Sequence, residues 1–136
     1  MMLTTKGRYA VMAVVDIAMH YDGNPVNLSE IARRQNIALN YLEQIFLKLK
    51  KTSIVTSRRG PGGGYALLDM PKNIKISSII DAVEEGIKIT RCGAVQDSCI
   101  AEKAKCKTHD LWNGLGNNIR FYLDNISIQD VLEGRL

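Results

Sequence analysis

The stretch NLSEIARRQNIALNYLEQIFLKLKK, residues 27–51, decides the fold of this chain. Residues 28–35 place apolar side chains at helical spacing, and Asn27 with Glu30 has the spacing of a capping box that would begin this helix. Asn36 opens a three-residue link, and asparagine tolerates the left-handed backbone that so tight a turn needs. A short helix, a tight turn and a longer helix in this order predict a helix-turn-helix.

The longer helix has a fixed buried face, because Leu42, Ile45, Phe46 and Leu49 recur at intervals of three, one and three. The remaining side chains are of types that bond base edges or phosphates in a DNA groove. We predict DNA contacts from Asn40, Tyr41, Glu43, Gln44 and Lys48. By itself this face is equally typical of a solvated helix, and Ala38 is a weak N-cap for it.

A glycine-rich hairpin is predicted after this helix. Residues 54–57 and 65–68 have the pattern of strands, and the segment RRGPGGG joins them. A hairpin in this position is the wing of a winged helix-turn-helix, and arginine suits the negative potential of a narrow minor groove. We predict DNA contacts in the wing from Arg58, Arg59, Gly60, Pro61 and Gly62. A nucleotide-phosphate loop is the alternative, but the Lys-Ser/Thr pair of a P-loop is missing from the sequence.

Two further helices are predicted around this unit. Thr4 or Thr5 is a candidate N-cap for a first amphipathic helix that ends near Tyr21, before a strong turn signal. Residues 76–85 predict another helix with apolar residues facing inward, and Gly86 is placed to close it. Both helices supply the apolar surface that supports the helix-turn-helix.

The basic residues are concentrated in the first half of the chain. The formal charge is +4 overall, but residues 1–60 hold nine Lys/Arg against four Asp/Glu, whereas residues 61–136 hold nine against ten. A basic half of this kind indicates a phosphate-bearing partner. We therefore predict further contacts with an operator in double-stranded DNA from Lys6 and Arg8.

A second long helix is predicted after Thr108, which is a candidate N-cap. Its apolar side chains fall at spacings of three, four, three and four, the pattern of a coiled-coil-like contact. These residues are predicted to form a homodimer interface: Trp112, Leu115, Ile119, Tyr122 and Ile126. Gly114 and Gly116 favour close approach of a neighbouring backbone, although a helix packed only within its own subunit is the alternative. Ser127 and Asp130 then form a capping box for a last short helix.

The stretch RCGAVQDSCIAEKAKCKTHD contains all three cysteines of the chain and one of its two histidines. Cys92, Cys99 and Cys106 have six residues between neighbours, and His109 follows three positions after the last. The sequence has no close Cys pair of the kind usual in structural zinc sites, and a redox disulfide would leave one cysteine over. A two-iron cluster needs four such ligands and suits the wider spacing. The residues alone leave these three chemistries open.

Other classes of protein are disfavoured by the sequence. The most apolar early run contains Asp16, is followed by no signal-peptide cleavage pattern, and is shorter than the ~20 residues that span a bilayer. We therefore expect a cytoplasmic protein with no membrane partner and with reduced thiols. We find no paired acid and base around a pocket and expect no enzyme. An iron–sulfur electron carrier is the alternative class, but it needs neither a wing nor a basic half.

Four features together resemble the Rrf-type family of winged-helix transcription factors. They are the runs LTTKGRYAVMA, YLEQIFLKLKK and RRGPGGGYAL, and the set of three cysteines with His109. The resemblance covers nearly the whole chain. It implies a dimeric DNA-binding protein with one 2Fe-2S cluster per subunit on the residues Cys92, Cys99, Cys106 and His109, with the cluster-assembly machinery as donor.

The resemblance also implies repression of cluster-assembly genes by the cluster-loaded form. Two features depart from the pattern of the family's cluster regulators. The six-residue gaps between cysteines are longer, and Ala38 stands where a capping Ser is expected. A regulator of the same family that responds to nitric oxide or to iron is therefore an alternative.

A chain of 136 residues has the common size of a single domain, and 46% hydrophobic content is enough for one core. We predict a mostly α-helical winged helix-turn-helix with a small β-hairpin and a long C-terminal dimerisation helix. Within one compact domain, residues 1–86 would form the DNA-binding region and residues 87–108 the cluster-binding loop. Residues 109–136 would form the dimerisation helix and a C-terminal helix.

Overall fold

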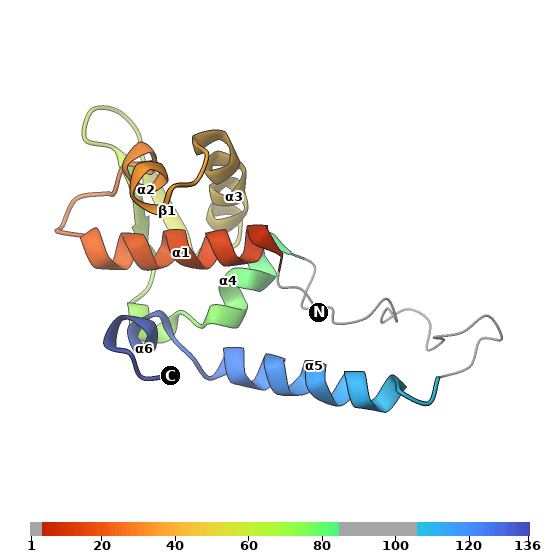
Figure 1. The fold of residues 1–136 in the computed structure, drawn as a ribbon. Coiled ribbons are helices and arrows are strands. Elements are labelled where there is room, and N and C mark those ends of the chain that lie inside the picture. Colours follow the sequence, from red (N-terminus) through yellow and green to blue (C-terminus); the bar gives the residue numbers. More distant parts are fainter. Residues whose placement is uncertain (1–3, 85–105) are drawn as a thin grey trace.

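The computed structural model describes residues 4–84 and 106–136 of the chain (Figure 1). The described part contains helices, one 3-10 turn and one antiparallel hairpin, which confirms the predicted mostly helical fold with a small hairpin. The elements in order are α1 (Thr5–His20), α2 (Leu28–Gln35), α3 (Leu39–Lys51), β1 (Val55–Arg58), β2 (Gly64–Leu67), η1 (Pro71–Asn73), α4 (Ile76–Val83), α5 (His109–Asp124) and α6 (Ile128–Glu133).

Helix α1 crosses the middle of the molecule. Helices α2 and α3 lie on one side of it, and α4, α5 and α6 lie on the other (Figure 1). This arrangement makes α1 the support of the helix-turn-helix formed by α2 and α3, because α1 contacts both of them as well as α4 and α6. The hairpin β1–β2 projects beside α3 as a wing.

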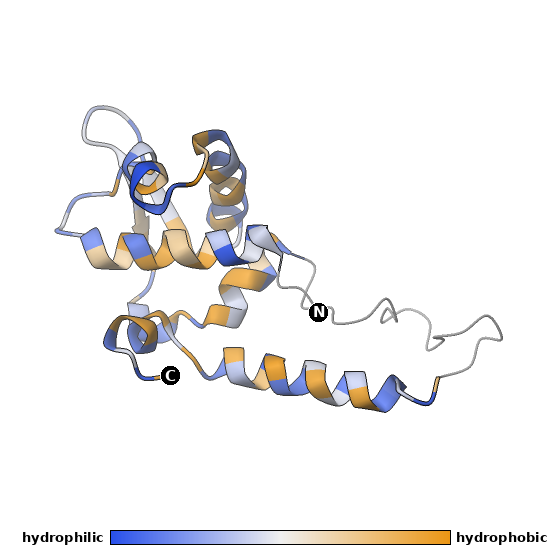
Figure 2. Ribbon diagram, in the orientation of Figure 1, coloured by the Kyte–Doolittle hydropathy of each residue, from blue (hydrophilic) through white to orange (hydrophobic). Residues whose placement is uncertain are grey.

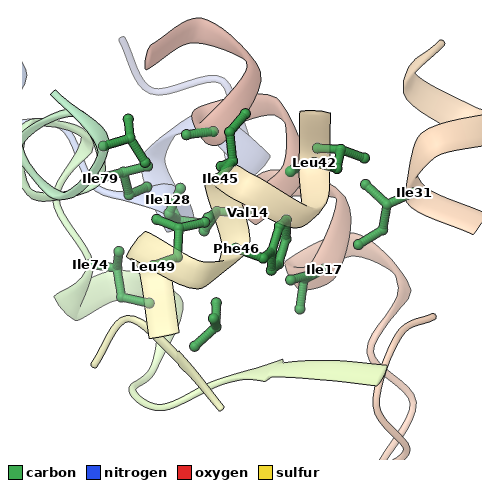
Figure 3. Close-up of a cluster of buried hydrophobic side chains, with 14 of the residues drawn as sticks. Val14, Ile17, Ile31, Leu42, Ile45, Phe46, Leu49, Ile74, Ile79 and Ile128 are labelled. Carbon is green, nitrogen blue, oxygen red and sulfur yellow. The ribbon is translucent and has the colours of Figure 1, made fainter. Parts of the chain in front are cut away.

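The core is a single cluster of apolar side chains contributed by most of these helices (Figure 3). Phe46 of α3 is fully buried at its centre, between residues of α1 and the wing. Ile128 of α6 is also fully buried in this cluster, so the end of the described chain is packed against its beginning. Side chains of this size each contribute about 1.5–3 kcal/mol when fully buried.

The helix starts follow local sequence signals in three places. Thr4 accepts a hydrogen bond from the backbone N–H of Gly7 at 3.3 Å and caps α1, as predicted. Asn27 caps α2 by accepting from Ser29 N at 2.8 Å. The predicted return bond of that capping box, from the backbone N–H of Asn27 to the Glu30 side chain, is wrong. The Glu30 carboxylate instead lies 3.6 Å from Arg34 Nη1. The predicted capping box of Ser127 at the start of α6 is confirmed.

Two other predictions, for the start of α5 and the end of α4, differ from the structure. Thr108 occupies the N-cap position of α5, but its side chain makes no cap hydrogen bond, and its Oγ1 lies 3.4 Å from Cys106 Sγ. Helix α4 ends at Val83 rather than at residue 85, because Glu84 has an extended backbone with φ −131° and ψ 161°. Gly86, the predicted closing residue, lies outside the described residues.

The predicted turn between α2 and α3 is confirmed. Asn36 has φ 54° and ψ 50°, the left-handed conformation that asparagine tolerates. Ala38 at the start of α3 makes no side-chain cap hydrogen bond, as its methyl group dictates. Helix α3, the second helix of the helix-turn-helix and hence its recognition helix, therefore begins without the cap hydrogen bond that Ser or Asp would supply. Its position depends on packing.

The C-terminal helices are joined to the body through the main chain. The backbone N–H of Ile76 donates to the carbonyl of Ile126 at 3.0 Å, and the N–H of Ile128 donates to the carbonyl of Ile74 at 2.9 Å. These bonds link the start of α4 to the connection between α5 and α6. The first turns of α5 lie farther from the body, and apolar segments continue along the whole helix (Figure 2).

Candidate DNA-binding surface and ligand segment

The outward face of α3 is defined by its buried face. Leu42, Ile45, Phe46 and Leu49 are fully buried, so the residues on the opposite side of the helix face solvent. We call these exposed residues the outward face of α3: Asn40, Glu43, Gln44, Leu47 and Lys51. At 3.6 residues per turn they fall within an arc of about 100°. Three of the predicted contacts, Asn40, Glu43 and Gln44, lie on this face; the sequence analysis did not include Leu47 or Lys51.

Two other predicted contacts lie at the flank of α3. Tyr41 is half-buried, and its ring packs edge-on against the ring of Tyr9 with centroids 5.8 Å apart. Lys48 is exposed, but its Nζ donates a hydrogen bond of 3.4 Å to the carbonyl of Val83 at the end of α4. In the described structure, Tyr41 and Lys48 therefore help to seat the recognition helix on α1 and α4.

A cluster of charged groups joins the start of α1 to α3 and α4. The pKa of Lys6 is lowered because its side chain shares a hydrogen bond with Lys48, is partly desolvated, and is repelled by the Lys48 charge, whereas Glu84 acts to raise it. The Glu84 carboxylate accepts from Gly7 N at 3.0 Å at the N-terminus of α1. Arg8, the second predicted contact of this helix, is exposed.

The wing is held by a third stretch of backbone. In the β1–β2 ladder Arg58 pairs with Gly64 and Val55 with Leu67, one residue away from the predicted strand limits. Val26, just before α2, pairs with Tyr65 through two backbone hydrogen bonds of 2.8 Å. The close approach at this point requires glycine, since a Cβ on Gly64 would lie 2.2 Å from the Val26 carbonyl oxygen. Sequence analysis missed this isolated β-bridge because a single paired residue has no periodicity.

The tip of the wing is solvent-exposed. Gly60 and Gly62 have φ of 93° and 75°, a backbone that other residues rarely adopt, and Gly63 N donates to the Gly60 carbonyl at 2.9 Å. All the residues predicted to contact DNA in the wing are exposed: Arg58, Arg59, Gly60, Pro61 and Gly62. The centroids of the Tyr65 and Phe46 rings lie 4.6 Å apart. This contact sets the position of the wing relative to the recognition helix.

A buried carboxylate fixes α2 against α1. Asp16 is fully buried and accepts hydrogen bonds from Arg34 Nε at 3.0 Å, Arg34 Nη2 at 2.7 Å and Gln35 Nε2 at 2.8 Å. Burial acts to raise the pKa of Asp16, but these hydrogen bonds and the Arg34 charge outweigh it, so the pKa lies below its usual value. His20, whose Nδ1 lies 3.5 Å from the same carboxylate, adds a smaller effect of the same sign. Sequence analysis did not predict this cluster; the position of Asp16 within an apolar helix face was the feature that could have indicated a buried partner for its carboxylate.

The described residues include two of the four predicted cluster ligands. Cys92 and Cys99 lie outside the described residues. Cys106 is half-exposed, and the backbone N–H of His109 donates to its carbonyl at 3.1 Å. His109 is 8% exposed, and its Nε2 lies 3.3 Å from Asn113 Nδ2. Residues 4–84 and 106–136 contain no group of three or more side chains able to hold a metal ion, so the full ligand set cannot be built from them.

The predicted dimer residues of α5 divide between two environments. Trp112, Leu115 and Tyr122 are 40%, 36% and 51% exposed, while Ile119 is half-buried. Ile126 lies beyond the end of α5 and packs against the core of its own chain. Leu111, also exposed, extends the apolar surface, and a Cβ on Gly114 would meet no atom within 4 Å. The apolar stripe is thus exposed near both ends of α5, with Ile119 half-buried between them, and is covered beyond the helix at Ile126.

The fold and this surface define a class of protein: a winged helix-turn-helix regulator of transcription, with DNA as its partner. The chain belongs to the Rrf2 family of iron-dependent transcriptional regulators, whose pattern matches residues 3–134. It is 45% identical over 132 residues to the HTH-type transcriptional regulator IscR of Aliivibrio salmonicida, a match that covers 97% of this chain and 77% of that protein.

Solved structures agree with this family. The structure of T. potens IscR aligns with a TM-score of 0.77 and 33% identity, covering 100% of this chain and 89% of that one. CymR, the global cysteine regulator of B. subtilis, aligns with a TM-score of 0.78 and 27% identity, covering 96% and 95%. These relatives are regulators of transcription and not enzymes, as predicted. Among the described helices, none is long and apolar enough to cross a membrane.

Proposed function

We propose that this protein is a homodimeric repressor whose binding to operator DNA responds to a 2Fe-2S cluster held by Cys92, Cys99, Cys106 and His109. The family description as iron-dependent and the relatives named IscR support this proposal. By the same resemblance, the regulated genes are those of iron–sulfur cluster assembly, whose machinery donates the cluster. The protein would act in the cytoplasm, where its operator DNA lies.

The observation that carries the proposal is the position of Cys106 and His109. The two residues lie at the start of α5, and a backbone hydrogen bond of 3.1 Å joins them. A thiol and an imidazole are donor types that bind 2Fe-2S clusters. Cys106 and His109 are of types that fit the proposed group, and a cluster bound to them would lie at the start of the apolar stripe of α5.

This position suggests how cluster status reaches the DNA-binding surface. When residues 92, 99, 106 and 109 bind one cluster, the first turn of α5 is tied to the preceding segment. The exposed part of the stripe, with Leu111, Trp112 and Leu115, then packs against a second copy of the chain. That contact sets the separation of two α3 helices, which must match half-sites about one helical turn of DNA apart, or a multiple of it. The bound cluster itself supplies reversible electron transfer.

Cluster binding is tested by anaerobic reconstitution. We expect about two iron and about two sulfide ions per subunit, with visible absorption that a zinc protein would not have. Cys106→Ala should lose most of the iron. Thr108→Ala is the matched control, since Thr108 Oγ1 lies 3.4 Å from Cys106 Sγ but is not a proposed ligand. Iron content well below two per subunit in the wild type would overturn the sensing half of the proposal.

Dimerisation is tested by placing a charge on the stripe. Leu115→Asp puts a carboxylate among the exposed apolar side chains of α5, so the sedimentation mass should fall to that of one chain. Asn117→Asp adds the same charge to the opposite side of the helix, at an exposed polar position, and should leave the mass unchanged. A dimer in both variants would contradict the proposed interface.

Operator binding is tested by its dependence on salt. Contacts from the wing, the outward face of α3 and the start of α1 to phosphates release counterions, so affinity should fall steeply as salt rises. Measurement with and without the cluster, on wild type and Cys92→Ala, tests the coupling. Equal operator affinity in all four samples would remove cluster sensing and leave only a DNA-binding protein.

A further inference from the structure

Leu47 is the apolar member of the outward face of α3. Its side chain is 68% exposed, although the helix already buries four large apolar side chains on its opposite face. By helical geometry it lies between Glu43 and Gln44 around the helix axis, one turn further along. The leucine side chain therefore contributes little apolar burial to the core.

The neighbours of Leu47 on this face are all polar or charged. Asn40, Glu43 and Gln44 precede it and Lys51 follows it, and all four are exposed. These side chains can bond base edges or phosphates, whereas an aliphatic side chain can recognise only one feature of the major groove. That feature is the C5-methyl group of thymine, which projects into the groove and is absent from the other bases.

We propose that Leu47 determines sequence specificity by contacting the methyl group of one thymine in each half-site. Leu47 lies seven positions beyond Asn40, a rise of about 10 Å along the helix. The thymine is therefore a different base from the one nearest Asn40. This inference rests on the DNA-binding function of the chain and adds a particular base to it.

The test begins with selection of operators from random DNA by the wild-type protein. Each thymine of the selected half-site is then replaced in turn by deoxyuridine, which lacks only the C5-methyl group. For the wild type we expect one position at which replacement weakens binding about four-fold per half-site, the factor equivalent to ~0.8 kcal/mol for one buried methyl group. At the same position, replacement should change the affinity of Leu47→Ala by less than two-fold.

Two controls separate this contact from other effects. Leu47→Ala should keep the wild-type circular dichroism, because alanine is the best helix former and the side chain packs on nothing in the core. Leu136→Ala removes a leucine of similar exposure, 72%, outside the recognition helix and should keep the full wild-type response to deoxyuridine.

The two possible failures are distinguishable. If deoxyuridine has the same effect on wild type and Leu47→Ala at every position, or if selected half-sites contain no thymine, Leu47 does not read a methyl group, although DNA binding stands. If no sequence is enriched and the protein shows no salt-dependent binding, the DNA-binding function itself fails, and this inference fails with it.

Discussion

The Asp16 cluster offers a quantitative test of how α2 is held. Asp16→Asn removes the negative charge and leaves the shape of the side chain nearly unchanged. The carboxylate is fully buried and accepts three side-chain hydrogen bonds of 2.7–3.0 Å from Arg34 and Gln35. Hydrogen bonds to charged groups contribute about 1.5–3 kcal/mol each, but Arg34 is 21% exposed and regains water when released. We expect the free energy of unfolding to fall by roughly 2–4 kcal/mol.

Urea unfolding followed by circular dichroism measures this loss, at a fixed protein concentration because the proposed dimer makes stability depend on concentration. With a urea dependence of about 2 kcal/mol per molar, within the usual range, the midpoint should fall by about 1–2 M. Glu30→Gln is the matched control: Glu30 lies 3.6 Å from the same guanidinium but is 59% exposed, so the loss should stay below about 0.5 kcal/mol. A loss below about 0.5 kcal/mol for Asp16→Asn, or equal losses for both variants, would refute the reasoning.

The same variant tests the sign of the pH dependence. The folded pKa of Asp16 is below its usual value, so its stabilising contribution is fully present above the unfolded pKa of about 3.9. This contribution is lost as the pH falls from about 3.9 through the folded pKa. The difference in unfolding free energy between wild type and Asp16→Asn should therefore be constant from about pH 5 to 7 and shrink below about pH 4. A difference that grows on acidification would contradict the lowered pKa.

Three further predictions concern the wing and the last helix. Gly64→Ala would place a Cβ 2.2 Å from the Val26 carbonyl oxygen, and we expect a loss of roughly 2–3 kcal/mol in a thermal melt; unchanged stability would exclude the close approach. Ser127→Ala removes the capping box of α6 and should cost about 1 kcal/mol in urea unfolding, whereas Ser78→Ala, at an exposed position of α4, should change stability by less than about 0.5 kcal/mol. Arg59→Ala should weaken operator binding and reduce the logarithmic salt slope by about one, and an unchanged slope would remove Arg59 from the phosphate contacts.

Helix α3 shows which structural features sequence periodicity can predict. The spacing of Leu42, Ile45, Phe46 and Leu49 predicted the buried face, and all four are fully buried. The assignment of the remaining side chains to DNA stays a prediction; the structure adds that Tyr41 packs on Tyr9. The same periodicity places Leu47 opposite the buried face, but an apolar residue was not considered there as a groove contact.

In the C-terminal half, apolar spacing alone could not predict which side chains are buried. The spacing predicted one continuous apolar stripe from Trp112 to Ile126; in the structure Trp112, Leu115 and Tyr122 are exposed, whereas Ile126 packs on the core of its own chain. Coverage depends on where α4 and α6 lie, and the backbone bonds of Ile76 and Ile128 decide that position. The stripe alone could not show which residues pack within the subunit.

The sequence by itself determined the helices, most of their caps, the left-handed turn at Asn36 and the hairpin with its glycine tip. These features depend on interactions within about four residues along the chain, so local patterns are sufficient to predict them. Only the tertiary structure decided that Asp16 binds Arg34 across 18 residues, that Val26 forms a β-bridge with Tyr65 of the wing, and that Tyr65 packs on Phe46. Such contacts join distant residues, and their partners are set by the path of the chain rather than by local spacing.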